Sequence, residues 1–349
     1  MAAQQDDDYI RTHPCPCCCI CSKAGQQLYR GLRDRLFDAP GEWGFKKCPN
    51  HECGLVWLDP MPWIEDIDKA YKNYYTHQDM RAVSNTWPRR IYLRAKEGYL
   101  ARRFGYHTKK VAVWKKFLGL LFYFHPGRRE NLDFSVMYLP SRPNGLLLDV
   151  GCGSGQKLMF MKDLGWLAEG VDFDPVAVES AKTKGLQVRS GTLEAQNYPD
   201  NYFDAVTMSH LIEHVHDPLG LLRECHRILK PGGLLVVVTP NNESWCHKLF
   251  KINWLALDPP RHLHVFSLMS LKSLTQRAGF PKIRVSTSIR EANGLFIASR
   301  SIQRTGKYLW GGPIPKTVRI WARGMQLLEW AILKLKRRLG EDIVMVGKK

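Results

Sequence analysis

Leu146–Leu147–Leu148–Asp149–Val150–Gly151–Cys152–Gly153–Ser154–Gly155 predicts a buried strand that runs directly into a glycine-rich turn. Three of these residues, Gly151, Gly153 and Gly155, lack the Cβ atom that would keep a ligand from the backbone or disfavour positive φ angles. An acid, Asp149, precedes the first glycine by two positions. The segment therefore indicates a strand–turn–helix unit whose main chain contacts a ligand at the turn.

The spacing of the glycines separates two classes of nucleotide-like ligand. A dinucleotide fingerprint requires G-x-G-x-x-G, whereas position 156 is Gln and the pattern here is G-x-G-x-G, which favours S-adenosylmethionine over NAD. A second acid, Asp172, ends an apolar strand 23 residues beyond Asp149, the length of one strand–helix–strand unit. Its carboxylate is placed to accept hydrogen bonds from both ribose hydroxyls. Asp174 precedes Pro175 and is expected to cap the next helix.

Further segments follow the glycine-rich turn in a defined order. They are Gly191–Thr192–Leu193–Glu194, the strand Phe203–Met208, Ser209–Val215 and Leu229–Lys230–Pro231–Gly232–Gly233. Together these motifs resemble class I S-adenosylmethionine-dependent methyltransferases over most of 145–280. The resemblance departs at Thr192, because the family usually has an Asp there that holds the adenine amino group. That contact is expected to pass to the Thr192 hydroxyl or to the backbone around Leu193.

The resemblance implies an α/β fold with a doubly wound, Rossmann-like seven-stranded sheet. A final antiparallel strand is expected at Ile343–Val346, after a helical insertion that follows a strand at Lys282–Ser286. The cofactor-binding residues that the resemblance implies are Asp149, Gly151, Cys152, Gly153, Gly155, Asp172, Phe173, Thr192, Leu193 and Ser209.

Four histidines are candidates for the group that removes a proton from an oxygen or carbon acceptor. His210 and His214 lie four residues apart, so a helical turn would place them on one face. His262 and His264 follow the fifth strand, where an extended segment would point both rings to the same side. We rank the candidates for the base in the order His214, His262, His264, with His210 as a further catalytic candidate. For each of them, a structural hydrogen bond is the alternative role.

The first 80 residues carry a cysteine pattern that indicates a structural zinc ion. Two cysteine pairs lie about 30 residues apart, the first with the spacing of a zinc knuckle and the second spaced Cys-x4-Cys. Cys21 and His51 are substitute ligands, and a reduced loop without metal is the competing interpretation. Disulfides are disfavoured because no hydrophobic signal segment precedes the cysteines, which predicts a reducing compartment. The expected ligands are Cys15, Cys18, Cys48 and Cys53.

Two motifs resemble particular groups of methyltransferases. The zinc-ribbon pattern followed by Cys53–Gly54–Leu55–Val56–Trp57–Leu58–Asp59–Pro60 resembles the front end of bacterial methyltransferases of polysaccharide and surface-glycan synthesis. Pro260–Arg261–His262–Leu263 resembles a subgroup with quinone-type and cell-surface glycan enzymes. The resemblance implies methylation of an oxygen or carbon of a sugar-containing or lipid-linked acceptor. The alternatives are a quinone-like small aromatic acceptor, favoured if the loop around His262 encloses an apolar pocket, and a non-catalytic zinc-bearing scaffold with a degenerate cofactor site.

The net charge of +18 is concentrated in two segments of the 349-residue chain. Residues 81–130 hold 13 Lys or Arg against two Glu, and residues 300–349 hold 12 against three acids. The cysteines, the charge and the glycine-rich motif together predict three parts. They are a cysteine-rich zinc-ribbon-like module at 1–80, a basic helical embellishment at 81–143 and a methyltransferase domain at 144–349. That domain contains a basic helical insertion at about 295–340.

An amphipathic helix is predicted in the second basic segment, where apolar residues recur at steps of three and four. Its aromatic and basic side chains suit an anionic membrane surface, so we expect a cytoplasmic protein or one peripheral at the cytoplasmic membrane face. Packing of the helix on the catalytic core is the alternative. Nucleic acid is a disfavoured partner, because no recognisable RNA- or DNA-binding module accompanies the basic residues. The apolar stripe consists of Val318, Trp321, Met325, Leu328, Ile332, Leu335 and Leu339.

Overall fold

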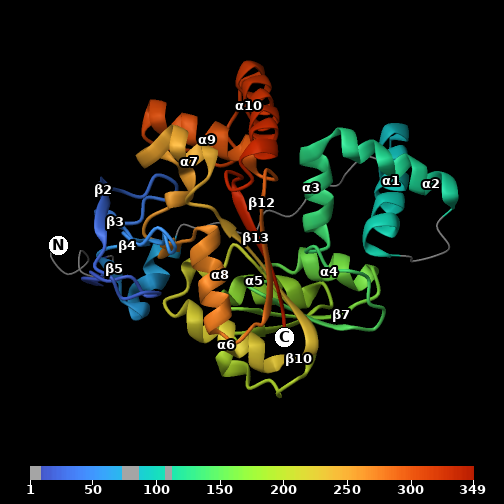
Figure 1. The fold of residues 1–349 in the computed structure, drawn as a ribbon, viewed down its shortest axis with the longest axis horizontal. Helices are drawn as coiled ribbons and strands as arrows, with labels where there is room; N and C mark the ends of the chain where they lie inside the picture. The colour runs from blue at the N-terminus through green and yellow to red at the C-terminus, as the bar shows by residue number, and fades with distance from the viewer. Residues whose placement is uncertain (1–8, 73–85, 107–111) are drawn as a thin grey trace.

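A computed structural model describes residues 9–72, 86–106 and 112–349, and its centre is a seven-stranded sheet (Figure 1). The strands are β6 (Leu146–Val150), β7 (Leu167–Asp172), β8 (Gln187–Ser190), β9 (Phe203–Ser209), β10 (Leu229–Pro240), β12 (Lys282–Ser288) and β13 (Asp342–Lys348). They lie in the order β12-β13-β10-β9-β6-β7-β8. The strands β6–β10 are parallel to one another, whereas β13 is antiparallel to both β10 and β12. This topology confirms the predicted class I methyltransferase fold.

Helices cover both faces of the sheet, which explains why its central strands are apolar almost throughout. Alternate residues of a strand point to opposite faces. On one face, Leu148 and Val237 pack with α6 (Pro218–Ile228) and α8 (Leu268–Arg277). On the other face, Leu147 and Val236 pack in a cluster that contains residues of α3 (Pro126–Ser135), α4 (Gln156–Asp163) and α5 (Pro175–Thr183).

The capping role predicted for Asp174 is present at the start of α5. Its Oδ1 atom accepts a hydrogen bond from the Val176 N–H at 2.8 Å. Asp217 caps α6 in the same way, because its Oδ1 accepts from the Gly220 N–H at 2.9 Å. Short 3-10 turns complete this part of the chain at Glu194–Gln196, Ile212–His214, Lys251–Asn253 and Leu255–Leu257.

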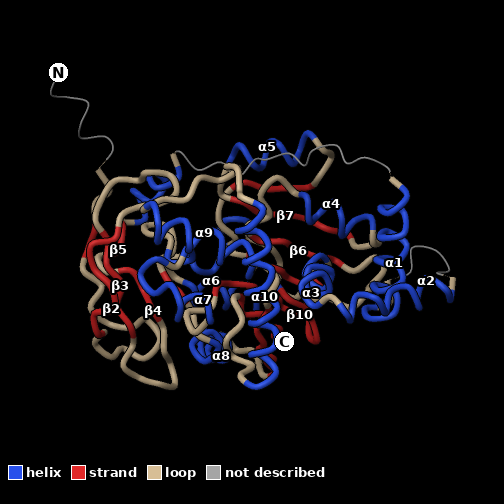
Figure 2. The backbone as a smooth tube through the Cα atoms, turned by 90° about the horizontal axis from the view of Figure 1, so that it is seen from above, coloured by secondary structure: helices blue, strands red, loops and turns tan. Residues whose placement is uncertain are grey.

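The N-terminal module shares a sheet with the rest of the chain. Its elements are β1 (Thr12–His13), β2 (Gln26–Leu32), β3 (Trp43–Lys47), β4 (Val56–Leu58), β5 (Met61–Pro62) and the 3-10 helix η1 (Ile64–Tyr71). Strand β4 pairs with β11 (His264–Val265), which belongs to the loop after β10. Figure 2 shows β2–β5 at one end of the molecule and α1 (Trp87–Phe104) and α2 (Val113–Leu118) at the other. The module is thus joined to the loop that carries His262.

Both basic segments contain helices that lie outside the central sheet, and the second segment ends in β13 of that sheet. The first contains α1, α2 and a 3-10 helix at Gly119–Phe124, and the second contains α9 (Ala292–Thr305) and α10 (Lys316–Leu335) beside α7 (Trp245–Phe250) (Figure 1). Only part of the predicted apolar stripe of α10 is covered. Trp321 and Met325 pack against the core, whereas Leu335 is 89% exposed. Within the described ranges, each helix is too short or too polar to cross a bilayer.

Helix α10 also carries a carboxyl group into the interior. Glu329 and Glu341 are both completely buried. Burial, followed by the charge of Glu341, raises the pKa of Glu329 to about 11. Burial raises the pKa of Glu341 to about 8. Both side chains therefore hold a proton near neutral pH, at which the unfolded chain has lost it.

We expect Glu329 and Glu341 to contribute a decrease in the free energy of unfolding as the pH rises from 6 to 8, because in the native state they hold protons that the unfolded state has lost. The buried histidines with lowered pKa values contribute in the opposite direction, so the effect of the pair is read from the difference between variant and wild type. Each such proton contributes a slope of about −1.4 kcal/mol per pH unit. Glu329→Gln removes one titrating group and should make the slope shallower by about that amount. Urea unfolding at pH 6, 7 and 8 measures it, with the exposed Glu179→Gln as control. Equal slopes in Glu329→Gln and the wild type would contradict the prediction.

Candidate active site

The glycine-rich turn lies at the carboxyl end of β6, immediately before α4. Gly151, Gly153 and Gly155 adopt positive φ angles of 72°, 53° and 76°. At Gly153, a Cβ atom would meet no heavy atom within 4 Å apart from its chain neighbours, so this side of the turn is open. Beneath the turn, Asp149 is buried and accepts a hydrogen bond from the Thr207 hydroxyl at 2.6 Å. The open backbone fits a ligand that contacts the main chain directly, as S-adenosylmethionine would.

Asp172 lies beside this turn at the end of β7. Its Oδ2 atom accepts a hydrogen bond from the Gly153 N–H at 2.7 Å, and Oδ1 accepts from the Asp174 N–H at 3.0 Å. The carboxylate is therefore fixed next to the open backbone. As a hydrogen-bond acceptor, it is suited to bind ribose hydroxyls. Phe173 follows it with 53% of its surface exposed. The centroids of the Phe173 and Tyr71 rings lie 5.7 Å apart in an edge-to-face arrangement. Asp172 and Phe173 form one wall at which a nucleoside can bind.

Thr192 and Leu193 follow β8 with different surroundings. Leu193 is buried in the core, whereas Thr192 is exposed and its Oγ1 accepts a hydrogen bond from the Ala195 N–H at 3.4 Å. The Thr192 hydroxyl thus helps to close the short turn that follows. Ser209 ends β9 and is half-buried. The adenine contact at this end of the sheet stays a prediction.

A cavity of about 1480 Å³ extends from the glycine-rich turn to the histidines. Cys152 and Ser154 line it on the turn side, and His210, His214 and His262 line it on the other. Single-ligand sites usually measure about 300–1,000 Å³, so this cavity has room for a cofactor together with a small acceptor. Its apolar and aromatic lining includes Phe37, Phe134, Leu255, Leu295, Tyr308 and Trp310.

His214 presents one ring nitrogen as a proton acceptor. Its Nδ1 atom lies 3.0 Å from the Tyr71 hydroxyl and 3.0 Å from the Arg261 carbonyl oxygen. Because a carbonyl can only accept, we assign the ring proton to Nδ1 and the lone pair to Nε2. Burial, followed by the neighbouring His262, lowers the pKa of His214 to about 4. The ring is therefore neutral near pH 7.

His210 and Glu213 form a close pair next to this histidine. Glu213 is fully buried, its Oε2 accepts from the Thr239 hydroxyl at 2.8 Å, and its Oε1 lies 3.4 Å from His210 Nδ1. Burial opposes ionisation of Glu213, but the hydrogen bond and charge of His210 lower its pKa to about 2. Burial likewise opposes protonation of His210, yet Glu213 and Asp342 raise its pKa. His210 has a φ angle of +51°, a strained backbone of the kind that functional sites retain.

His262 lies against His214, with ring centroids 4.7 Å apart in an edge-to-face arrangement. Its Nδ1 donates to the Ala256 carbonyl at 2.8 Å, which leaves Nε2 as an acceptor. One atom each of Glu213, His214 and His262 lies within 4.8 Å of the others, so the same set could hold a metal ion.

The expectation that His262 and His264 point to one side is wrong. Strand β11 begins only at His264, and the residues before it form a turn, so the alternation of an extended strand does not reach His262. His264 is buried in β11, opposite Trp57 of β4, and lies outside the lining of the cavity. His262 lines it.

A buried ion-pair network holds the loop that carries His262. Arg261 is completely buried, and its Nη1 and Nη2 donate to the two oxygens of Asp34 at 2.7 and 2.8 Å. The same guanidinium donates to Asp258 through Nε at 3.1 Å and to the carbonyl of Ala70 at 3.1 Å. Such bidentate bonds fix orientation as well as distance. The N-terminal module thereby positions His262 and His214.

The cysteine cluster differs by one member from the expected set. The sulfur atoms of Cys18, Cys21, Cys48 and Cys53 lie within 4.8 Å of one another, with 3.6 Å between Cys18 and Cys53 and 3.3 Å between Cys21 and Cys48. Cys15 lies outside this group, where its N–H donates to Asp59 Oδ1 at 2.6 Å. Disulfide sulfurs are about 2.05 Å apart, whereas four sulfurs around one zinc ion are about 3.8 Å apart. The observed separations fit the zinc arrangement.

Comparison with known families identifies the part of the chain that contains the turn and the histidines. Residues 124–285 match a family described as a methyltransferase domain. The chain carries a methyltransferase domain. The matched residues include the glycine-rich turn, Asp172 and the pair His210 and His214, and exclude the cysteine cluster.

Curated relatives resemble the methyltransferase domain over part of their length. The ubiquinone biosynthesis O-methyltransferase of Cereibacter sphaeroides is 34% identical over 149 residues, which cover 39% of this chain and 60% of the relative. The protein of the same name from Xanthomonas campestris is 38% identical over 107 residues, covering 28% and 44%. A solved S-adenosylmethionine-dependent methyltransferase from Archaeoglobus fulgidus has 22% identity and a TM-score of 0.43, covering 67% of this chain and 99% of that one. The chain spans at most 60% of the length of these two curated relatives.

Several residues around the cavity of the methyltransferase domain were not among the predicted site residues. Glu213 lies inside the segment Ser209–Val215 and could have been selected as the acid between two histidines. Tyr71, Arg290 and Asp342 come from distant parts of the chain, and only the folded topology brings them to the histidines. No spacing in the sequence signals that proximity.

Proposed function

We propose that this protein transfers a methyl group from S-adenosylmethionine to a hydroxyl oxygen of a small aromatic acceptor. The observation that supports the reaction most directly is the continuity of one cavity from Cys152 and Ser154 of the glycine-rich turn to the neutral ring of His214. Asp172 lies outside the lining of this cavity and adjoins the turn through the Gly153 N–H. When bound, S-adenosylmethionine supplies an electrophilic methyl group, which leaves its sulfur and forms a bond to the acceptor oxygen.

The residues of the chain would position the reactants and remove one proton. Main-chain groups at Gly151–Gly155 and the Asp172 carboxylate hold the cofactor, and such positioning carries much of the rate enhancement in a transfer of this kind. His214 Nε2 accepts the proton of the acceptor hydroxyl. The imidazolium that forms lies next to the Glu213 carboxylate, which stabilises its charge. The hydrogen bonds of Nδ1 keep the ring in the required tautomer.

The lining of the cavity supports an aromatic acceptor over a sugar. Leu255 and Ala256, from the loop that carries His262, line the cavity together with Leu295 and Phe134. Rings and alkyl groups bind such walls, while the histidines and charged side chains such as Lys157 and Arg290 supply the polar contacts. The relatives named as ubiquinone biosynthesis O-methyltransferases point in the same direction. Our first expectation, a sugar-containing or lipid-linked acceptor at a membrane surface, has no comparable support.

The acceptor class can be tested by incubating the purified protein with S-adenosylmethionine and either a 4-alkyl catechol or a sugar nucleotide. We expect mass spectrometry to detect a monomethylated catechol and an unchanged sugar. Methylation of the sugar alone would overturn the aromatic acceptor but retain the reaction type.

We also propose that Cys18, Cys21, Cys48 and Cys53 hold a structural Zn²⁺. Cys18, Cys48 and Cys53 are buried and pack against Leu55 and Trp57 of the core cluster. A zinc ion at this point would cross-link the β2–β4 sheet to the preceding loop, and small modules of this kind depend on metal to fold.

Cys48→Ser is expected to reduce zinc from about one ion per chain to a trace, because three thiolates bind the ion much less tightly than four. Plasma mass spectrometry of the purified protein measures the zinc, and thermal unfolding should show a Tm at least about 5 °C lower. Cys17→Ser, a change at an exposed cysteine of the same segment, is the matched control and should keep both values. Zinc-free wild-type protein would rule out the site.

A further inference from the structure

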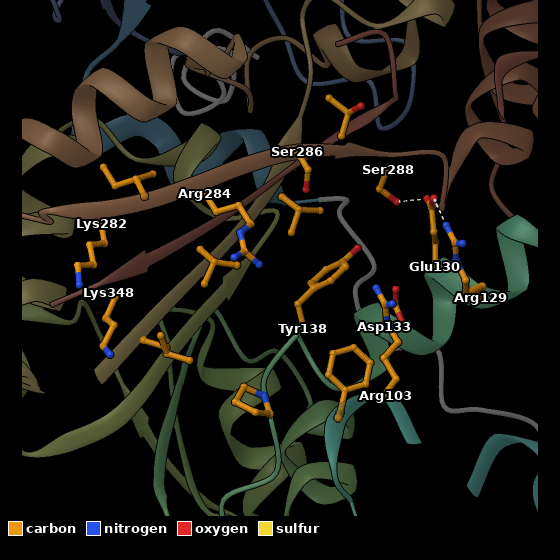
Figure 3. Close-up of a pocket in the computed structure, with 17 residues that line it drawn as sticks. Arg103, Arg129, Glu130, Asp133, Tyr138, Lys282, Arg284, Ser286, Ser288 and Lys348 are labelled. Carbon is orange, nitrogen blue, oxygen red and sulfur yellow. Dashed lines mark hydrogen bonds and ion pairs between the residues drawn. The ribbon is translucent and has the colours of Figure 1, made fainter. Parts of the chain in front are cut away.

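A second cavity, of about 750 Å³, is shown in Figure 3. It lies across α3 from the cavity that the histidines line. It is formed between α3, the end of α1 and the outer strands β12 and β13. Helix α3 separates the two cavities, because Arg129, Glu130 and Asp133 face this one, while Asn131 and Phe134 face the cavity of the histidines. The proposed methyl transfer does not use it.

The strand side of this cavity is strongly basic. Lys282, Arg284 and Ser286 are alternate residues of β12 and face the cavity together. Lys348 of β13 is the direct cross-strand partner of Lys282, so the two ammonium groups extend from the same face (Figure 3). Like charges directly opposite each other on a sheet are destabilising. An anion between them would remove that repulsion.

The acids in the cavity wall are already engaged by other groups. Asp133 Oδ1 accepts from the Tyr99 hydroxyl at 2.6 Å and pairs with Arg103 at 2.9 Å. Glu130 Oε2 accepts from the Ser288 hydroxyl at 2.7 Å and from the Ile289 N–H at 2.6 Å. Within residues 9–72, 86–106 and 112–349, no carboxylate oxygen lies within 4.0 Å of the charged nitrogens of Lys282, Arg284 or Lys348. The cavity therefore offers uncompensated positive charge.

The floor of the same cavity is apolar. Leu234 of β10 and Val344 and Val346 of β13 face it from the same side of the sheet as Lys348. Phe104 at the end of α1 and Pro140 also line it. A ligand that fits both features carries an anionic group at one end and a hydrocarbon chain at the other.

We propose that this cavity binds a phosphate ester with an apolar substituent. The guanidinium of Arg284 suits two phosphate oxygens at once, and Lys282 and Lys348 add point charges on either side. A phosphate monoester carries nearly two negative charges at neutral pH, which matches a group of three cations better than a single charge does. The apolar substituent lies along Leu234, Val344 and Val346.

The experiment is a calorimetric titration of the full-length protein, without cofactor or acceptor, with decyl phosphate below its micelle-forming concentration. Inorganic phosphate and decanol are titrated separately. We expect decyl phosphate to bind at least about tenfold more tightly than either, because only it engages both the basic strands and the apolar floor. Equal affinity for inorganic phosphate would overturn the apolar part of the proposal, and equal affinity for decanol would overturn the anionic part.

The double variant Lys282→Gln/Arg284→Gln should bind decyl phosphate at least about tenfold more weakly than the wild type, because it lacks two of the three uncompensated cations. The control, Lys182→Gln/Lys316→Gln, makes the same change in net charge at exposed residues outside the cavity and should leave the affinity unchanged. If the double variant does not fold, Lys348→Gln takes its place. Unchanged affinity in the folded variant would overturn the site. These titrations contain no methyl donor, so their outcome is independent of the proposed methyl transfer.

Discussion

His214→Ala is expected to lower kcat for methyl transfer by about 10²–10⁴-fold, the usual contribution of a general base. The affinity for S-adenosylmethionine should stay within about threefold of the wild type, because the ring lines the cavity away from the turn at which we propose that the cofactor binds. The physical reason is specific to this position: burial keeps the ring neutral, its Nδ1 proton is held by the Arg261 carbonyl, and Nε2 is left to accept a proton. Initial rates with a catechol acceptor, together with a binding titration, measure the two quantities.

The control for this variant is His226→Ala on α6, where the ring packs against Phe280 and lies outside the cavity. Added imidazole should restore part of the activity of His214→Ala but not change the control. A His214→Ala protein that binds cofactor and keeps wild-type kcat would contradict the assignment, and would move the proton acceptor to His262 or His210.

Asp172→Ala is expected to weaken S-adenosylmethionine binding by at least about 10²-fold. The carboxylate is expected to accept hydrogen bonds from two ribose hydroxyls, and each such charge-assisted bond contributes about 1.5–3 kcal/mol. Alanine makes neither bond. The same substitution removes the acceptor of the Gly153 N–H, so the glycine-rich turn loses one of the bonds that fix it. Isothermal titration of the folded variant measures the affinity.

Asp174→Ala is the matched control for this experiment, since it removes a carboxylate two residues away. Asp174 caps α5 through the Val176 N–H, and the loss of a cap costs about 1 kcal/mol of stability. We therefore expect a lower Tm but an unchanged affinity for Asp174→Ala. Equal cofactor affinity in Asp172→Ala and the wild type would show that another group binds the ribose.

The sequence was sufficient to predict the sheet because its signals are local. The apolar run at Leu146–Val150, the glycines after it and the acid at Asp172 each belong to one strand and its following turn. The final antiparallel strand was predicted at Ile343–Val346 and extends over Asp342–Lys348. Strand ends fray into neighbouring residues, and their limits depend on the partner strand, which the sequence alone does not specify.

The arrangement of the histidines and cysteines depends on contacts between distant segments, which no spacing encodes. The sequence included His264 among the bases, but pairing of β11 with β4 buries it away from the cavity. Cys15 and Cys21 both have knuckle spacing to Cys18, and the chain turn at 18–22 brings Cys21 rather than Cys15 to the cluster. The Arg261–Asp34 ion pair joins residues 227 positions apart and fixes the loop of His262. These contacts required the folded structure.

The most direct test of the central claim is a calorimetric titration of the purified protein with S-adenosylmethionine and with its demethylated product, S-adenosylhomocysteine. The glycine-rich turn, the open backbone at Gly153 and the fixed Asp172 carboxylate predict that both bind, at about one molecule per chain. Binding of neither compound would contradict the account, because Thr192 would then mark a cofactor site that has been lost.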